Sequence, residues 1–98
     1  MAKYFMTWEV NESAFPTEPK QMAAAVVKMM EAVKQGIAEG RTTDWGAFVG
    51  ENKGYSVGET SALELNKNLQ RFAPYVKFTV REVVSADDVL ETFKPMMG

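Results

Sequence analysis

Residues 3 to 10 read Lys-Tyr-Phe-Met-Thr-Trp-Glu-Val and carry the clearest structural pattern in the chain. The segment is rich in aromatic and β-favouring side chains, and every second residue from Tyr4 to Val10 is apolar. Because successive side chains of a strand point to opposite faces of a sheet, this alternation predicts a strand with one apolar face. The flanking sequence must then supply partner strands and a layer that covers this face.

A long amphipathic helix is predicted for residues 18 to 39, after a loop over residues 11 to 19 that contains two prolines. Its apolar residues recur three and four positions apart, while charged residues take the opposite side. The apolar positions are Met22, Val26, Met29, Met30, Val33 and Ile37. Gly40 stands where the end of a helix favours a left-handed residue, so we expect the helix to stop there.

A hairpin is predicted next, from two further stretches of alternating residues. They cover residues 43 to 50 and residues 55 to 60, and the four residues Glu-Asn-Lys-Gly join them. We expect Gly54 in this link to supply the positive φ that hairpin loops often need. The two strands are then antiparallel neighbours.

A second helix and a fourth strand follow the hairpin. Ser61 precedes Glu64 by three residues, which is the spacing of a capping box, and Pro74 closes the apolar helical stripe that begins there. Residues 75 to 84 alternate again between apolar and polar side chains, which predicts a strand.

The predicted order is therefore β-α-β-β-α-β with a tail, in which Ser85 and Asp88 repeat the capping-box spacing ahead of a short C-terminal helix. Right-handed crossovers place both long helices on one face of a four-stranded antiparallel sheet with strand order 4-1-3-2. A chain of 98 residues that is 46% hydrophobic suffices for one core. We predict an α+β, ferredoxin-like βαββαβ fold that forms a single domain over residues 1–98.

Strand parity assigns each sheet residue to one of two faces. The predicted helix-covered face holds mostly large apolar side chains: Tyr4, Met6, Trp8, Trp45, Ala47, Val49, Tyr55, Val57, Val76, Phe78 and Val80. The predicted open face mixes aromatic, hydroxyl and charged side chains: Phe5, Thr7, Glu9, Asp44, Phe48, Ser56, Lys77, Thr79 and Arg81. Any chemistry is expected on the second set.

Composition excludes several classes of function. The chain has no cysteine and no histidine, which removes disulfides, thiol nucleophiles, the usual neutral-pH base and the commonest metal ligands. Its net charge is −2 and its basic residues are spread out, so nucleic acid is not an expected partner. No apolar stretch approaches the length of a membrane span. We expect a cytoplasmic protein without metal, cofactor or membrane.

Two interpretations of the open face stay open. In one it faces solvent or packs in a homodimer and has no site. In the other it lines a pocket for a small organic ligand, built from two phenylalanines and a few polar groups. In such a pocket Glu9 is the candidate general base, and Lys77 or Arg81 would hold an anionic or enolate-like group. Each of these three residues also fits a surface ion pair.

The sequence resembles a family of small uncharacterised bacterial and archaeal proteins. The segments that carry the resemblance are Tyr4–Trp8, Trp45–Gly50, Gly54–Val57, Glu59–Thr60, Phe72–Phe78 and Val83–Val84. That family is similar to the dimeric α+β barrel superfamily, whose members pair two ferredoxin-like sheets face to face. The resemblance implies this fold and homodimerisation. It also implies two functional classes, a non-catalytic ligand-binding or interaction module and a small cofactor-independent enzyme of monooxygenase or isomerase type.

The resemblance brings no established catalytic residue. Enzymes of the wider superfamily often carry a histidine in the pocket, and this chain has none. The binding or interaction module is therefore the first expectation, and the enzyme that uses carboxylate acid–base chemistry is the second.

Overall fold

The computed structural model of the chain describes residues 2–98 and shows an α+β fold. The four-stranded antiparallel sheet and the predicted helices are confirmed. In chain order the elements are β1 (Ala2–Val10), α1 (Pro19–Ala38), β2 (Thr42–Ala47), β3 (Lys53–Thr60), α2 (Ala62–Gln70), β4 (Val76–Val83), α3 (Ala86–Phe93) and the 3-10 helix η1 (Lys94–Met97).

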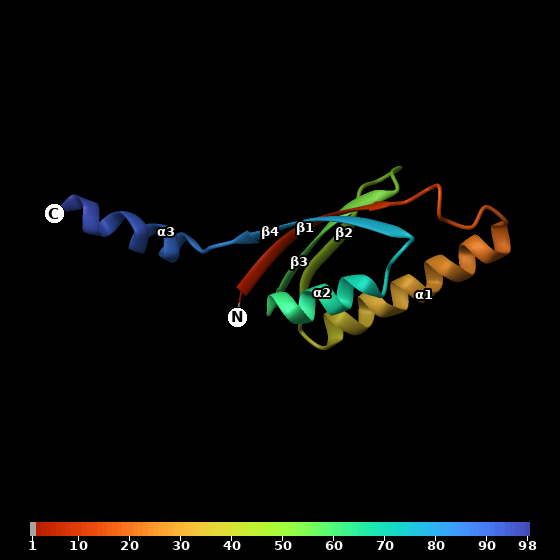
Figure 1. Ribbon diagram of the computed structural model, residues 1–98, viewed down its shortest axis with the longest axis horizontal. Helices are drawn as coiled ribbons and strands as arrows, with labels where there is room; N and C mark the ends of the chain where they lie inside the picture. The colour runs from red at the N-terminus through yellow and green to blue at the C-terminus, as the bar shows by residue number, and fades with distance from the viewer. Residues whose placement is uncertain (1) are drawn as a thin grey trace.

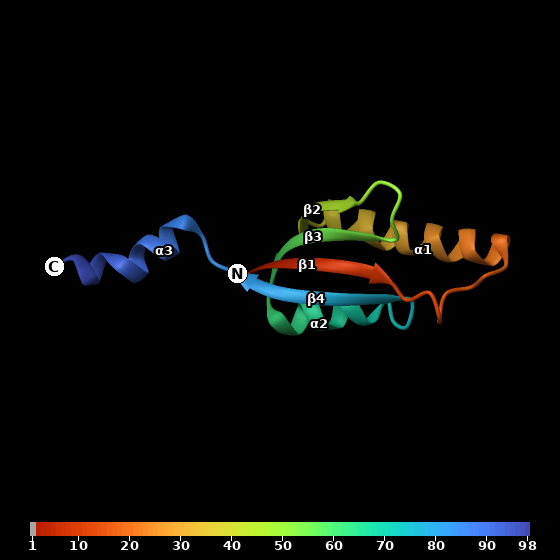
Figure 2. The same ribbon diagram turned by 90° about the horizontal axis from the view of Figure 1, so that it is seen from above.

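The strands lie in the order β2-β3-β1-β4 across the sheet, which is 4-1-3-2 when it is read from the β4 edge. All three neighbouring pairs are antiparallel. Helices α1 and α2 lie on the same side of the sheet (Figure 1), α1 below β2 and β3 and α2 below β4 (Figure 2). The segment after β4 leaves this body, residues 2–83, and projects away from it, so the chain is 64 Å long but only 25 Å by 21 Å across.

Side-chain caps fix where the helices begin. The Glu18 carboxylate accepts hydrogen bonds from the backbone N–H groups of Lys20 and Gln21 at 3.2 and 2.9 Å, which satisfies two donors that have no partner within α1. The Ser61 hydroxyl accepts from the Glu64 N–H at 3.2 Å and starts α2 as its spacing predicts. Gly40 has a φ of 80°, which confirms the predicted left-handed residue after α1.

The predicted strand over residues 43 to 50 is too long. β2 ends at Ala47, and Phe48 to Asn52 form the turn, with the positive φ at Gly50. Val49, predicted to lie in the core, is therefore fully exposed. Gly54, predicted to form the loop, lies inside β3 instead. A side chain at Gly54 would collide with the Gly46 carbonyl and with the Trp8 ring, so the glycine allows the close approach of β1, β2 and β3.

The predicted parity of β3 is wrong. Ser56 pairs with Met6 and is buried on the helix side, whereas Tyr55 and Val57 lie opposite Thr7 and Phe5 on the open face. The helix side of β3 carries only Gly54, Ser56, Gly58 and Thr60, all buried. Small residues are needed there because the large side chains of the neighbouring strands extend over β3.

The core between the sheet and the helices is thin. Tyr4 and Met6 are the buried apolar side chains of residues 2–98, at 8% and 5% exposure, and no side chain of this part is completely buried. Met22, Val26 and Ile37, from the apolar stripe of α1, all remain more than two-fifths exposed. The helices therefore stand on the predicted side of the sheet but do not close on it.

Candidate functional site

A wide concavity lies between the sheet and the two helices. We call it the hollow; its volume is about 910 Å³ and it is open to solvent. Its principal lining is Met6, Trp8, Trp45, Ser56 and Phe78 from the sheet, Met22, Val26, Met30 and Val33 from α1, and Leu65 and Leu69 from α2. These residues are almost all apolar because the facing sides of the sheet and helices follow the periodicity that the sequence predicts.

Two aromatic pairs line the hollow, one within the sheet and one between β4 and the turn that precedes it. The rings of Trp8 and Trp45 stack at 5.3 Å between centroids, with 10° between their planes. The Trp8 indole N–H donates to the Tyr55 carbonyl at 3.3 Å, so its polar edge is satisfied and its ring lines the hollow. Phe78 meets Phe72 edge to face at 5.8 Å. The sheet side thus offers rigid aromatic surface.

Polar groups in the hollow are few. Ser56 is the buried hydroxyl on the sheet side, with Thr60 further along β3. Arg41 and Arg71 also line it; Arg41 is held by Glu39 at 2.9 Å, and Arg71 is exposed just after α2. The carboxylates of Glu12 and Glu51 line the hollow as well. With so few polar groups, the hollow suits an apolar group that needs little polar recognition.

The open face holds eight of the nine predicted site residues. Five of them, Thr7, Glu9, Phe48, Lys77 and Thr79, line one shallow depression of about 530 Å³ together with Lys53. Three others lie elsewhere on this face, because Phe5 pairs with Arg81 across β1 and β4 while Asp44 belongs to β2. Ser56 is the exception, since it lines the hollow on the other side of the sheet.

Glu9, the candidate general base, lies between two lysines. It is opposite Lys53 on β3 and Lys77 on β4, and its carboxylate is 4.0 Å from the Lys53 ammonium. Both side chains of this pair are more than half exposed. Such a pair contributes only about 0–1 kcal/mol, so its effect on the fold is small.

An aromatic group on the open face was missed from the sequence. Tyr55 stacks between Phe5 and Phe48, with centroid distances of 6.4 and 6.5 Å, and its hydroxyl donates to the Asp44 carboxylate at 3.0 Å. This hydrogen bond, and to a lesser degree burial and the negative charge of Asp44, raise the pKa of Tyr55 above its usual value. The pair of glycines at positions 54 and 58 is the sequence signal that would have placed Tyr55 on this face. These glycines lie on the helix side of β3, beneath large side chains of β1.

Residues 2–98 contain neither a cluster of potential metal ligands nor a helix suited to crossing a membrane. In that part of the chain no three acidic side chains come together in a way that would bind a metal ion. No helix there combines the length and the apolar character that crossing a membrane requires. A comparison with models of known protein families and a search of curated proteins both find no match.

Proposed function

We propose that this protein is a non-catalytic ligand-binding or interaction module that homodimerises, and that its binding site is the hollow. The observation that carries the proposal is an apolar space of about 910 Å³ inside a body of under a hundred residues. That volume is within the range of about 300–1,000 Å³ found for small-molecule sites, which are also mostly apolar with few polar groups. The resemblance to ferredoxin-like, dimeric α+β barrel proteins supports pairing with a second copy. The lack of cysteine suits a reducing compartment, so the proposal includes a cytoplasmic location.

The two tryptophans make the proposal directly testable. The chain has only Trp8 and Trp45, and both line the hollow. We expect the dye 1-anilinonaphthalene-8-sulfonate, titrated into the full chain at submicromolar concentration, to bind saturably and to quench tryptophan emission by energy transfer. Val26→Asp, which places a charge on the hollow side of α1, should weaken this binding at least tenfold.

The matched control for this test is Ala24→Asp. Ala24 is exposed on the same helix and does not line the hollow, so its substitution adds the same charge without touching the site. Dye that does not saturate, or that binds the Val26→Asp and wild-type chains equally, would show that the hollow is not the binding site. Far-ultraviolet circular dichroism of both variants checks that α1 is retained.

The second candidate is a small cofactor-independent enzyme, of monooxygenase or isomerase type, that uses carboxylate acid–base chemistry on the open face. The observation in its favour is that one depression gathers Thr7, Glu9, Lys77 and Thr79. A carboxylate beside an ammonium group is a base–stabiliser pair for removing a proton next to a carbonyl.

This candidate predicts exchange of the methyl protons of pyruvate with deuterated solvent, followed by NMR. Glu9→Gln should slow the protein-dependent exchange by about 10²–10⁴-fold, the usual contribution of a positioned general base. Glu12→Gln, a substitution of an exposed carboxylate in the loop after β1, is the control and should leave the rate unchanged. Exchange no faster than in buffer would remove this candidate.

A further inference from the structure

The C-terminal segment has an apolar side that no other part of residues 2–98 covers. We call residues 84–97 the arm; it contains α3 and η1. Its apolar residues Val89, Leu90, Phe93, Met96 and Met97 recur at the spacing of one helix face, and Leu90 and Phe93 are 53% and 57% exposed. A stripe of this kind is what a helix buries against another element.

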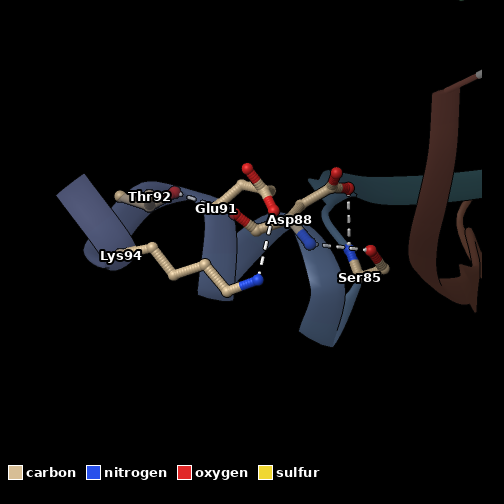
Figure 3. A network of polar contacts seen from close by, with 5 residues as sticks. All are labelled: Ser85, Asp88, Glu91, Thr92 and Lys94. Carbon is tan, nitrogen blue, oxygen red and sulfur yellow. Dashed lines mark hydrogen bonds and ion pairs between the residues drawn. The ribbon is translucent and has the colours of Figure 1, made fainter.

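The arm is nevertheless built as a definite helix. The Ser85 hydroxyl accepts from the Asp88 N–H at 3.0 Å, and the Asp88 carboxylate accepts from the Ser85 N–H at 3.1 Å, which completes a capping box (Figure 3). Figure 3 also shows the Thr92 hydroxyl bonded to the Asp88 carbonyl and Lys94 paired with Glu91. Helices this short are marginal in water unless their apolar face packs on something.

The arm does not pack on its own body. The only element with which α3 makes substantial contact is η1, and both project beyond the end of the sheet (Figure 1). Only Val84 and Ser85 separate β4 from α3, and Ser85 is fixed by the capping box. A link this short does not readily let the arm fold back onto its own body. Short hinges of this kind favour exchange of a segment between two copies of a chain.

The hollow is long enough to hold the arm. β1 extends over about 30 Å, at ~3.3 Å for each of its residues, while α3 and η1 together span about 20 Å. The polar side of the arm carries Asp87, Asp88 and Glu91, while the hollow is lined by charges of both signs, Arg41 and Arg71 with Glu12 and Glu51. The arm thus brings an apolar side to a site whose walls are mostly apolar.

We propose that the arm of one copy docks in the hollow of a second copy, with its Leu90 and Phe93 face toward the aromatic sheet surface, and that the second arm returns the contact. The inference rests on the proposed function, because it names the occupant of the same hollow. A two-fold axis makes the exchange reciprocal, so each dimer contains two identical arm–hollow contacts and neither copy keeps an unpaired surface.

The first experiment measures the mass of the full chain by size-exclusion chromatography with light scattering. We expect a dimer for the wild type at tens of micromolar and a monomer for Leu90→Asp. Thr92→Asp adds the same charge on the polar side of the arm and should remain a dimer. Because the arm makes no substantial contact with the body, neither substitution should unfold the body. A monomeric wild type or a dimeric Leu90→Asp would overturn the inference.

The second experiment tests where the arm docks. Val26→Asp damages the hollow and leaves the arm intact, whereas Leu90→Asp does the reverse, so each variant alone should be a monomer. Mixed in equal amounts they should form a heterodimer that retains one intact arm–hollow contact, detected by native mass spectrometry. Its absence, or a dimer of Val26→Asp alone, would show that the arm does not dock there. Should Val26→Asp lose its helical circular dichroism, Met22→Asp takes its place.

Dye binding to the wild type and to Leu90→Asp distinguishes two outcomes: that the arm does not dock in the hollow, and that the hollow is not a binding site at all. Release of the arm in Leu90→Asp should increase dye binding over the wild type at tens of micromolar, because the hollow is then empty. Equal saturable binding in both chains would overturn the arm exchange alone and leave the hollow as a binding site. No saturable binding in either chain would remove the hollow itself.

Discussion

Both faces of the sheet carry aromatic side chains, but these are used in different ways. On the helix side, Trp8, Trp45 and Phe78 line a hollow that α1 and α2 leave unfilled. On the open side, Phe5 and Phe48 stack against Tyr55 and are surrounded by paired charges and hydroxyls. The first face is suited to burying an apolar partner, and the second to remaining in contact with water.

The two sides of β3 determine where large side chains fit on each face of the sheet. Its helix side is made of glycine and small hydroxyl residues, which gives the rings of Trp8 and Trp45 their room. Its other side carries Tyr55 and Val57, which enlarge the open face. A change in the bulk of β3 should therefore alter both faces at once.

The largest expected effect is that of Gly54→Val. The new side chain would overlap the Gly46 carbonyl and the Trp8 ring, and neither can move without separating β2 from β3 or β1 from the tryptophan pair. We expect the free energy of unfolding to fall by about 3 kcal/mol or more, the upper part of the range for overpacked sites, in urea denaturation followed by circular dichroism.

Gly98→Val is the matched control for this prediction. Nothing lies within 4 Å of a side chain built at Gly98, so the same change there should leave the unfolding free energy as it is. If Gly54→Val were as stable as the wild type, the small-residue side of β3 would not be what holds the tryptophan pair in place.

A smaller effect is expected from removing side chains on either face. Met6 is 5% exposed on the helix side, and its neighbour Phe5 is 40% exposed on the open side. Met6→Ala should lower the unfolding free energy by about 2 kcal/mol, the low end for a buried methionine, because Met6 lines the open hollow and its truncation leaves no enclosed cavity. Phe5→Ala should cost clearly less in the same denaturation experiment. The reverse order would mean that the open face is the real core of the protein.

The sequence was sufficient to predict the elements of the fold because each has its own local pattern. Alternation marked β1 and β4, the apolar stripe marked α1, and cap spacings marked the starts of α2 and α3. The faces of β1, β2 and β4 followed from the same parity, with Trp8, Trp45 and Phe78 on the helix side as predicted.

The face of β3 could not be predicted in this way, because its alternating residues are small on one side and moderately apolar on the other. Burial of the larger set is the ordinary expectation, but the neighbours of β3 already fill that space. The register is fixed instead by the fit of Gly54 beneath Trp8, which is a contact between strands far apart in the sequence. The hollow escaped prediction for a related reason, since periodicity shows which side of a helix faces the sheet but not how closely the two layers approach.

The smallest expected effect concerns the pair Tyr55 and Asp44 on the open face. The hydrogen bond to Asp44 raises the pKa of Tyr55 above its usual 10.0, so the folded chain keeps this phenolic proton at pH values where the unfolded chain has lost it. The stabilisation is fully present below the pKa of Tyr55 in the unfolded chain. It is lost as the pH rises from that value through the higher pKa of the folded chain. Asp44→Asn removes the charged acceptor, so the loss of stability above pH 10.0 should become shallower. Tyrosinate absorbance and urea midpoints measured across this range would show it, with Asp87→Asn on the arm as a control that should leave the alkaline slope unchanged. Equal slopes in the wild-type and Asp44→Asn chains would mean that the open face does not hold the Tyr55 proton, and the pair would then be an ordinary exposed contact.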